Sequence, residues 1–310
     1  MLDVRRMRVL REVALRGSIA GAAESLSFTP SAVSQQVAKL EQEAGVALVN
    51  RGPRSISLTE AGKRLVEHAE AILERLDEAE SDLRRLAGVE APLRLGSITT
   101  AAATILPAAL KGFVRRRPEN EVTVLEADPL VSLARLRARE LDVAVVFEYD
   151  YVPLPDDDRL QLEPLLEEPL RVVLPEGHPV ARQRAVHLPD LAAETWIRST
   201  QRSSCRPFTE RACQAAGFTP RIVADFDDYT VMQNAVAAGV GVAFAPDMGL
   251  SRLSPGVAVR PIAFAAPRRR VLVAVRRGEA DEPAVAAMLE SLRESVAAQQ
   301  PLFPALVGAS

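Results

Sequence analysis

Between Ser18 and Leu40 the sequence combines small polar side chains with regularly spaced apolar ones. Thr29-Pro30 is typical of a helix start, because the threonine hydroxyl can accept a free backbone N–H and proline fits the first helical turn. Val33, Val37 and Leu40 then recur at helical spacing, which predicts one buried face. The other face would carry short hydrogen-bonding groups and one cation: Ser31, Ser34, Gln35 and Lys39. Such a helix can enter the major groove of DNA and contact base edges.

A second helix must hold this one in place, and the residues just before it have the required pattern. Ser18 can cap a short helix, and Ala22, Ala23 and Leu26 give that helix an apolar face of small side chains. Small side chains let two helices approach closely. A further helical pattern precedes both and ends at Gly17. These spacings predict a helix-turn-helix module.

Two short strands with a basic turn follow this module. Residues 46–49 and 55–58 read as strands, and the turn between them carries Arg51 and Arg54. Taken alone, two arginines in a turn indicate only an exposed loop. Beside a helix-turn-helix, they favour a wing whose arginines replace counterions at DNA phosphates. Thr59 then opens another helix.

That helix continues with an apolar residue at every third or fourth position. The series predicts a heptad seam over residues 65–86: Leu65, Ala69, Ile72, Leu76, Ala79, Leu83 and Leu86. A helix that packs on its own domain tends to have a wider apolar stripe, so the narrow seam favours a coiled-coil homodimer. Two copies of the reading helix on one dimer predict a palindromic DNA target.

From Leu93 onward, short strands alternate with helices, which predicts an α/β domain. Its predicted elements include a helix from about Ala102 to Arg117, a strand over 170–174 and a helix over 204–216. The chain crosses from one group of elements to another and back, so we expect two lobes with a cleft between them. The expected divisions are a winged helix-turn-helix domain at 1–58, a linker helix and hinge at 59–91, lobe I at 92–164 and 266–298, lobe II at 165–265, and a tail at 299–310.

Open α/β sheets bind ligands at the carboxyl ends of their strands. Residues that follow the predicted strands, together with aromatic residues suited to an aromatic ligand, form the candidate effector site: Ser97, Thr99, Thr100, Ala101, Asp128, Phe147, Ser199, Thr200, Tyr229 and Phe244. The hydroxyl residues are equally suited to capping helices, and a cap is already placed to bond a carboxylate.

Composition excludes several classes of protein. Of the 310 residues, 48% are apolar, yet no uncharged apolar run is long enough to cross a membrane. The N-terminal residues lack the apolar core of an export signal, which predicts a cytoplasmic protein. Residues 1–64 carry a net charge of +4 and the remainder −7, the pattern of a basic DNA reader joined to an acidic module. The three histidines and two cysteines form no ligand spacing, so neither metal nor cofactor is predicted.

The segment from Ser18 to Leu65 resembles the amino-terminal module of the LysR-type transcriptional regulators. The resemblance rests on TPSAVSQQV, on LEQEAGVAL followed by an arginine, and on LTEAG. Val49 stands where most members have phenylalanine. The resemblance implies groove contacts from Pro30, Ser31, Ser34 and Gln35, with Arg51, Arg54, Ser55 and Thr59 at the backbone or wing. It also implies an effector domain similar to periplasmic binding proteins, a homotetramer, and a small organic anion as effector.

Three alternatives compete with this interpretation. An enzyme is disfavoured, because the chain lacks G-x-S-x-G, P-loop and G-x-G-x-x-G motifs. A solute-binding transport protein conflicts with the DNA module. A thiol redox regulator would use Cys205 and Cys213. These lie eight residues apart in one predicted helix, roughly 12 Å by helical rise. Cys205, near the start of that helix and followed by Arg206, would be a thiolate of lowered pKa.

Overall fold

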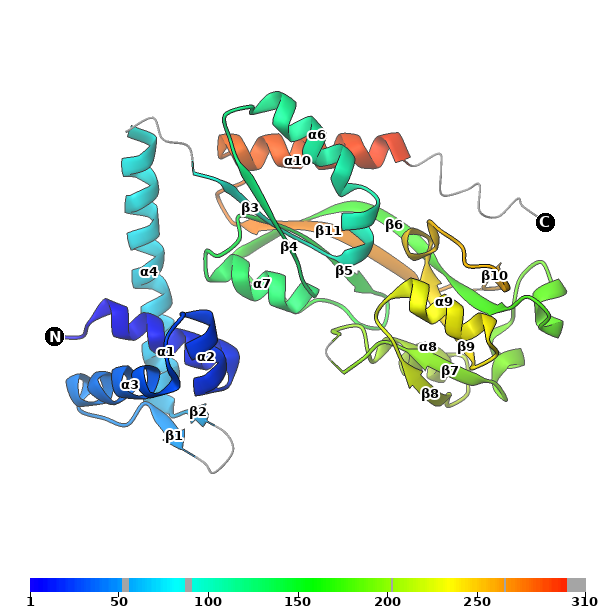
Figure 1. Cartoon of the computed structure of the whole chain (residues 1–310), viewed down its shortest axis with the longest axis horizontal. Helices are drawn as coiled ribbons and strands as arrows, with labels where there is room; N and C mark the ends of the chain where they lie inside the picture. Colours follow the sequence, from blue (N-terminus) through cyan, green and yellow to red (C-terminus); the bar gives the residue numbers. More distant parts are fainter. Residues whose placement is uncertain (52–55, 87–90, 202, 265, 300–310) are drawn as a thin grey trace. The chain divides into compact units, whose positions relative to one another are not determined.

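The computed structural model describes residues 1–51, 56–86, 91–201, 203–264 and 266–299. It divides into two compact units, Met1–Ala91 and Pro92–Ser310. The first unit is a helical module with a small hairpin (Figure 1). Its elements are α1 (Val4–Arg16), α2 (Ile19–Ser25), α3 (Pro30–Ala44), β1 (Val49–Arg51), β2 (Ile56–Leu58) and α4 (Glu60–Leu86).

The predicted caps define the ends of the first three helices. The Ser18 hydroxyl accepts the Gly21 N–H at 3.0 Å, and the Thr29 hydroxyl accepts the Ala32 N–H at 3.2 Å. Gly17 and Gly45 end α1 and α3 with φ of 62° and 71°, a left-handed backbone that glycine adopts without steric cost. These ends fix the lengths of the helices and therefore which residues face the core.

The core of this unit is formed by the apolar residues that the sequence indicated. Ala22 and Ala23 on α2 pack with Val33 and Val37 on α3, and all four are almost fully buried. Leu48 and Val49 close the same core from the chain that leads into the hairpin. The short valine at position 49 is 6% exposed, so it fills its place despite replacing the more usual phenylalanine.

The first hairpin strand differs from its prediction. Residues 46–48 are not in a strand, and β1 begins only at Val49. The amides of Leu48 and Val49 both donate to the Glu41 carboxylate, at 2.9 and 3.2 Å. Because α3 binds the Leu48 amide, pairing begins only at Val49, and among the described residues it comprises three pairs, from Val49–Leu58 to Arg51–Ile56.

The heptad seam divides in two along α4. Ala69 is fully buried in the core of the helical module, whereas Ile72, Leu76 and Leu83 are 41, 45 and 66% exposed. Leu73, which is not part of the seam, is 9% exposed. The start of α4 therefore packs on its own unit, and its later apolar side chains face outward in the single chain.

The second unit is built on a mixed sheet. Among the described residues its strands run β4-β3-β5-β11-β6-β9-β7-β8, with β10 also paired to β6. The strands are β3 (Leu93–Ser97), β4 (Val122–Glu126), β5 (Val143–Tyr149), β6 (Leu160–Pro175), β7 (Thr195–Arg198), β8 (Arg221–Asp225), β9 (Val242–Pro246), β10 (Val257–Pro261) and β11 (Arg268–Arg276). The α-helices are α5 (Thr99–Ala103), α6 (Leu106–Arg116), α7 (Pro129–Arg137), α8 (Phe208–Ala215), α9 (Tyr229–Ala237) and α10 (Pro283–Gln299).

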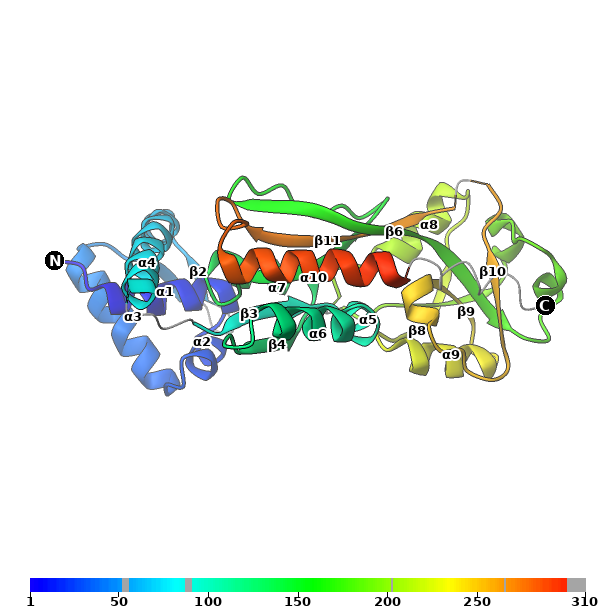
Figure 2. The ribbon, with the colours of Figure 1, turned by 90° about the horizontal axis from the view of Figure 1, so that it is seen from above.

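Helices cover both faces of this sheet, so its central strands are apolar on both sides. In β5, Val143 and Val145 face the core under α6 and α10, while Ala144 and Val146 face the core under α7. Figures 1 and 2 show α6 and α10 side by side, with α7 on the opposite face of the sheet. Around β7 and β9, α8 packs on one face and α9 on the other.

The strand β6 belongs to both halves of the sheet. Residues 160–169 pair with β11 in the first half, and residues 170–175 pair with β9 and β10 in the second. The sequence indicated only 170–174 as a strand. The earlier part, QLEPLLEEP, contains glutamates and prolines that mask strand propensity, and it is held by pairing with β11.

Two predicted helices are shorter than expected. The helix predicted from Ala102 to Arg117 is broken between α5 and α6, where Pro107 cannot donate the hydrogen bond that a continuous helix needs. The helix predicted over 204–216 begins only at Phe208, because proline at 207 disfavours a helical conformation for Arg206 before it. Neither these nor any other helix in the described part of the chain is long and apolar enough to span a membrane.

Candidate DNA-binding surface and effector pocket

The outward face of α3 carries the predicted reading residues. Ser31, Gln35 and Lys39 are exposed and, at a spacing of four, lie in one row along the helix. Ser34 beside them is half-buried, and Thr29 and Pro30 are exposed at the start of the helix. The helix that carries this row is held firmly by the core, because Val33, Val37 and Leu40 on its opposite face are at most 1% exposed.

The predicted backbone contacts are only partly described. Arg54 and Ser55 lie outside the described residues, and for Arg51 only the backbone in β1 is described. Thr59 has an internal structural role: its hydroxyl donates to the Ala47 carbonyl at 2.8 Å and accepts the Gly62 N–H at 3.0 Å. It therefore joins the start of α4 to the chain that enters the hairpin.

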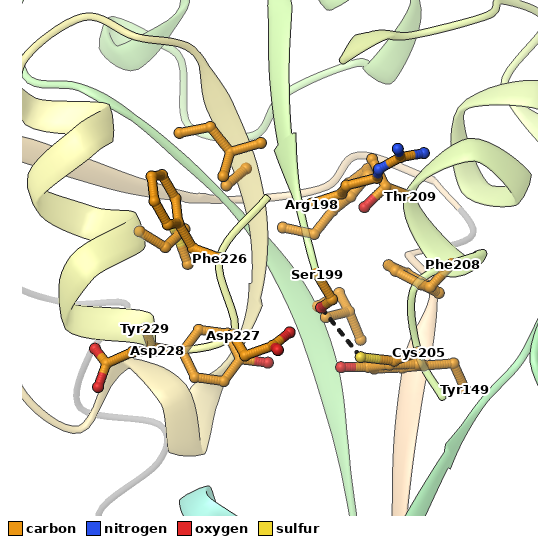
Figure 3. Close-up of a pocket in the computed structure, with 15 residues that line it drawn as sticks. Tyr149, Arg198, Ser199, Cys205, Phe208, Thr209, Phe226, Asp227, Asp228 and Tyr229 are labelled. Atoms are coloured by element: carbon orange, nitrogen blue, oxygen red, sulfur yellow. Dashed lines mark hydrogen bonds between the residues drawn. The ribbon is translucent and has the colours of Figure 1, made fainter. Parts of the chain in front are cut away.

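A pocket lies at the carboxyl ends of β7 and β8 in the second half of the sheet. It encloses about 440 Å³ of empty space, measured out to the solvent at its mouth. Its polar wall comes from three segments: Ser199 after β7, Asp227 and Asp228 before α9, and Cys205 before α8. Figure 3 shows the Asp227 carboxylate directed into the space facing Ser199 and Cys205.

Aromatic side chains form much of the remaining wall: Tyr149, Phe208, Phe226, Tyr229 and Phe244. The rings of Tyr149 and Phe208 are 4.3 Å apart, and Phe208 and Phe244 meet edge to face at 5.5 Å. The phenol groups of Tyr149 and Tyr229 lie close enough to influence each other's pKa. Burial raises the pKa of Tyr229 to about 12, so both phenols remain neutral.

The structure brings only some of the predicted effector residues to this pocket. Ser199, Tyr229 and Phe244 line it. Seven others are not among its lining residues: Ser97, Thr99, Thr100, Ala101, Asp128, Phe147 and Thr200. Several of these have internal roles. Ser97 and Ala101 are fully buried, and the Thr99 hydroxyl donates to Glu126 at 2.7 Å. Phe147 packs against Tyr149 and lies 5.4 Å from the Arg269 guanidinium carbon.

Asp128 links the two halves of the sheet. One carboxylate oxygen caps α7 by accepting the Leu130 N–H at 3.0 Å, and the other accepts the Ser204 N–H at 2.8 Å. Ser204 lies in the turn between β7 and α8. The side chain that we expected to contact a ligand thus holds that turn against the first half of the sheet.

Arg198 is the cation among the described lining residues, and acidic side chains surround it. It pairs with Glu210, and its Nε lies 2.9 Å from Asp225. Arg206 pairs with the other oxygen of Asp225 at 3.2 Å. In Figure 3 the Arg198 guanidinium points away from Asp227.

The two cysteines differ from the redox prediction. Cys205 lies in a turn before α8 and not in the same helix as Cys213. Burial raises the pKa of Cys205, although the hydroxyls of Ser199 and Ser203 contact its sulfur. The predicted lowered pKa is therefore wrong, because desolvation outweighs the local hydrogen bonds. Burial also raises the pKa of Cys213 to about 12, as expected for a thiol in the core.

Sequence reasoning missed Asp227, Asp228 and Cys205 as pocket residues. The two aspartates follow β8 after Phe226, so the strand-end rule that selected Ser199 would also have found them. Phe208 and Tyr149 had no comparable signal, because their positions depend on how α8 and the end of β5 pack together.

Comparison with known proteins decides the family. Residues 4–63 match the model of the bacterial regulatory helix-turn-helix proteins of the lysR family, and residues 87–297 match the LysR substrate binding domain. The chain belongs to the LysR family. It is therefore a transcriptional regulator with a DNA-binding module and an effector-binding domain, as the sequence predicted.

Individual LysR-type relatives resemble the chain over most of its length. It is 28% identical to the transcriptional dual regulator GltC of Bacillus subtilis, over 87% of this chain and 89% of GltC. It is 27% identical to a hydrogen peroxide-inducible genes activator of Dickeya chrysanthemi, over 94% and 95% of the two chains. Full-length OxyR from Pseudomonas aeruginosa has the same fold, with a TM-score of 0.63 at 24% identity over 96% and 95% of the chains. The predicted α/β effector domain with a winged helix-turn-helix module is confirmed.

Proposed function

We propose that this LysR-type regulator binds a palindromic operator as a homodimer joined through α4, assembled further into a homotetramer, and that a small molecule in the pocket at β7 and β8 controls it. The observation that carries the DNA-binding part is the exposed row of Ser31, Gln35 and Lys39 on a helix whose other face is fully buried. The residues proposed to contact DNA are Thr29, Pro30, Ser31, Ser34, Gln35 and Lys39 on α3, with Arg51, Arg54, Ser55 and Thr59 at the wing.

The base-reading role is tested by Gln35→Ala. The glutamine amide can both donate to and accept from an adenine edge, so its loss should reduce specific over nonspecific binding by about 1–3 kcal/mol. Binding isotherms on operator and scrambled DNA at one salt concentration measure this difference. Gln42→Ala is the matched control, because Gln42 is exposed on the last turn of the same helix. An equal loss on both DNAs would make Gln35 a backbone contact.

The dimer is tested by Leu76→Asp. Leu76 lies on the outward part of the heptad seam and is 45% exposed in the single chain, so a partner helix would bury it. A carboxylate there would be desolvated without a partner, and we expect the dimer to dissociate. Sedimentation velocity measures the change. Leu15→Asp places the same charge at an exposed leucine on α1 and should leave assembly intact. An unchanged profile for Leu76→Asp would contradict the coiled coil.

For the effector domain we propose lobe I at 92–164 and 266–298 and lobe II at 165–265, joined through β6 and β11. The domains before them are the winged module at 1–58 and the linker at 59–91, and a tail at 299–310 follows. Ser199, Tyr229 and Phe244 are proposed as effector contacts, together with Asp227 and Cys205. Asp128 on the lobe I side accepts a hydrogen bond from the Ser204 amide on the lobe II side. A ligand that moved the β7–α8 turn would change this contact and the relation of the two lobes.

A redox mechanism is less well supported. A relative in Dickeya chrysanthemi is named for induction by hydrogen peroxide. In this chain, however, burial raises the pKa of both cysteines, which keeps them as thiols near neutral pH and disfavours a reactive thiolate. The effector function is therefore preferred, and a cytoplasmic location suits a protein that binds chromosomal DNA.

A further inference from the structure

The pocket differs from a site built to hold an organic anion, in that protein carboxylates already occupy several of the donor groups at its edge. Both the amide and the hydroxyl of Thr200 donate to Asp227. Two amides in the first turn of α9, at Thr230 and Val231, donate to Asp228 at 2.7 and 2.9 Å. A carboxylate ligand would have to displace these aspartates to use those donors.

In the turn between β7 and α8, backbone amides likewise donate hydrogen bonds to acceptors within the protein. The amide of Ser204 donates to Asp128, and that of Cys205 donates to the Ser203 hydroxyl at 3.4 Å. The amide of Arg206 donates to the Ser203 carbonyl at 3.2 Å. Backbone N–H groups at strand ends and helix starts are the usual donors to small anions, and here internal acceptors bind them.

The cations near the pocket are also compensated. Arg198 pairs with Glu210 and Asp225, as described above. Arg269, behind the two tyrosines, is 1% exposed and pairs with Glu168, which is 4% exposed. Among the described lining residues, Asp227 and Asp228 therefore leave the wall with a net negative charge. Such a wall attracts cations and repels anions.

The aromatic rings complete a site for an organic cation. Asp227 shares the lining of the pocket with the aromatic rings of Tyr149, Phe208, Tyr229 and Phe244. An ammonium group gains from a carboxylate and from aromatic faces within about 6 Å, and the apolar part of the ligand gains from the same rings. In Figure 3 the Asp227 carboxylate points into the pocket, whereas that of Asp228 points away from it. Asp227 is therefore the expected partner of the ammonium group.

We propose that the effector of this regulator is a small organic amine bound as its cation, with the ammonium group at Asp227 and its apolar part among the aromatic rings. This inference rests on the proposed role of the pocket in effector binding. It replaces the organic anion that the family resemblance implied.

The chain contains an internal reporter for the test. Trp196 is the single tryptophan, it is fully buried, and its ring lies 4.7 Å from that of Phe244 in the pocket wall. Full-length protein is titrated with benzylamine, benzyl alcohol and benzoate, which share one ring and differ in charge. Tryptophan fluorescence and calorimetry report binding, in the wild type, in Asp227→Asn and in a control, Asp158→Asn, which changes an exposed aspartate outside the pocket.

We expect benzylamine to bind and change the fluorescence, and benzoate not to bind. Asp227→Asn should weaken benzylamine about tenfold or more by removing a charge-assisted hydrogen bond, whereas Asp158→Asn should not. If benzoate or benzyl alcohol binds at least as tightly with the same fluorescence change, the pocket remains the effector site and the assignment of a cation is overturned. If benzylamine binds but neither changes the fluorescence nor binds more weakly to Asp227→Asn, both the assignment of a cationic effector and the assignment of this pocket as the effector site are overturned. If none of the three compounds binds, the assignment of an organic cation as effector is overturned.

Discussion

Glu168→Gln is expected to lower the free energy of unfolding of the effector-binding domain by about 3–5 kcal/mol, the usual cost of leaving one member of a buried ion pair alone. Glu168 on β6 and Arg269 on β11 stand directly opposite each other in the sheet. One Glu168 oxygen bonds the arginine, and the other accepts the Met248 N–H at 2.7 Å. Neutralising the glutamate would leave the guanidinium charge buried without its partner. Urea denaturation followed by circular dichroism measures the loss.

The neighbouring pair supplies the matched control. Glu167 pairs with Arg268 on the same two strands, but their side chains are 39 and 60% exposed. Glu167→Gln should therefore change stability by less than about 1 kcal/mol. The double variant Glu168→Leu with Arg269→Met removes both buried charges and should recover most of the stability lost in Glu168→Gln. A small effect of Glu168→Gln alone would mean that water reaches the pair.

Gly62→Ala is expected to destabilise the DNA-binding module by about 1–3 kcal/mol or more and to weaken DNA binding with it. A Cβ at this position would lie 2.0 Å from the Leu48 carbonyl oxygen, a backbone atom that cannot rotate away. That oxygen accepts the Thr59 N–H at 3.0 Å. The added methyl group would therefore push apart the start of α4 and the chain entering the hairpin.

Thermal unfolding and operator binding of the same preparation measure both effects. Gly177→Ala is the control, because a Cβ there meets nothing within 4 Å and the backbone is not left-handed. If Gly62→Ala unfolds at the wild-type temperature and binds DNA normally, the close packing of α4 on Leu48 is wrong.

The helical module was largely predictable because its signals are local. Thr29-Pro30 determines where α3 begins, Gly45 determines where it ends, and the spacing of Val33, Val37 and Leu40 determines which face is buried. The strand over 46–49 begins only at Val49, because Glu41, on the preceding helix, accepts the Leu48 amide that earlier pairing would need. Strand predictions depend on partners that the local sequence does not contain.

The effector pocket was less predictable for the same reason. The strand-end rule selected Ser199, which lines the pocket, but it could not show that the strand ends of the first half of the sheet carry internal contacts. Thr99 bonds Glu126, and Asp128 reaches Ser204, 76 residues away in the chain. The charge of the pocket depends on where Arg198 points, and its guanidinium lies with Glu210 and Asp225 because α8 brings Glu210 to it. Family resemblance gave the class of effector domain, and side-chain geometry led to a different class of ligand.

The sharing of β6 limits how the effector-binding domain can move. Its residues 160–169 bond β11, and residues 170–175 bond β9 and β10. Each half keeps its own backbone hydrogen bonds along β6, and leaving any of them unmade would cost free energy. Relative motion of the two halves must therefore bend or twist β6 itself near residues 169–170, where its partners change. Amide hydrogens at the centre of β6 should thus be among the slowest to exchange with deuterium, with or without effector.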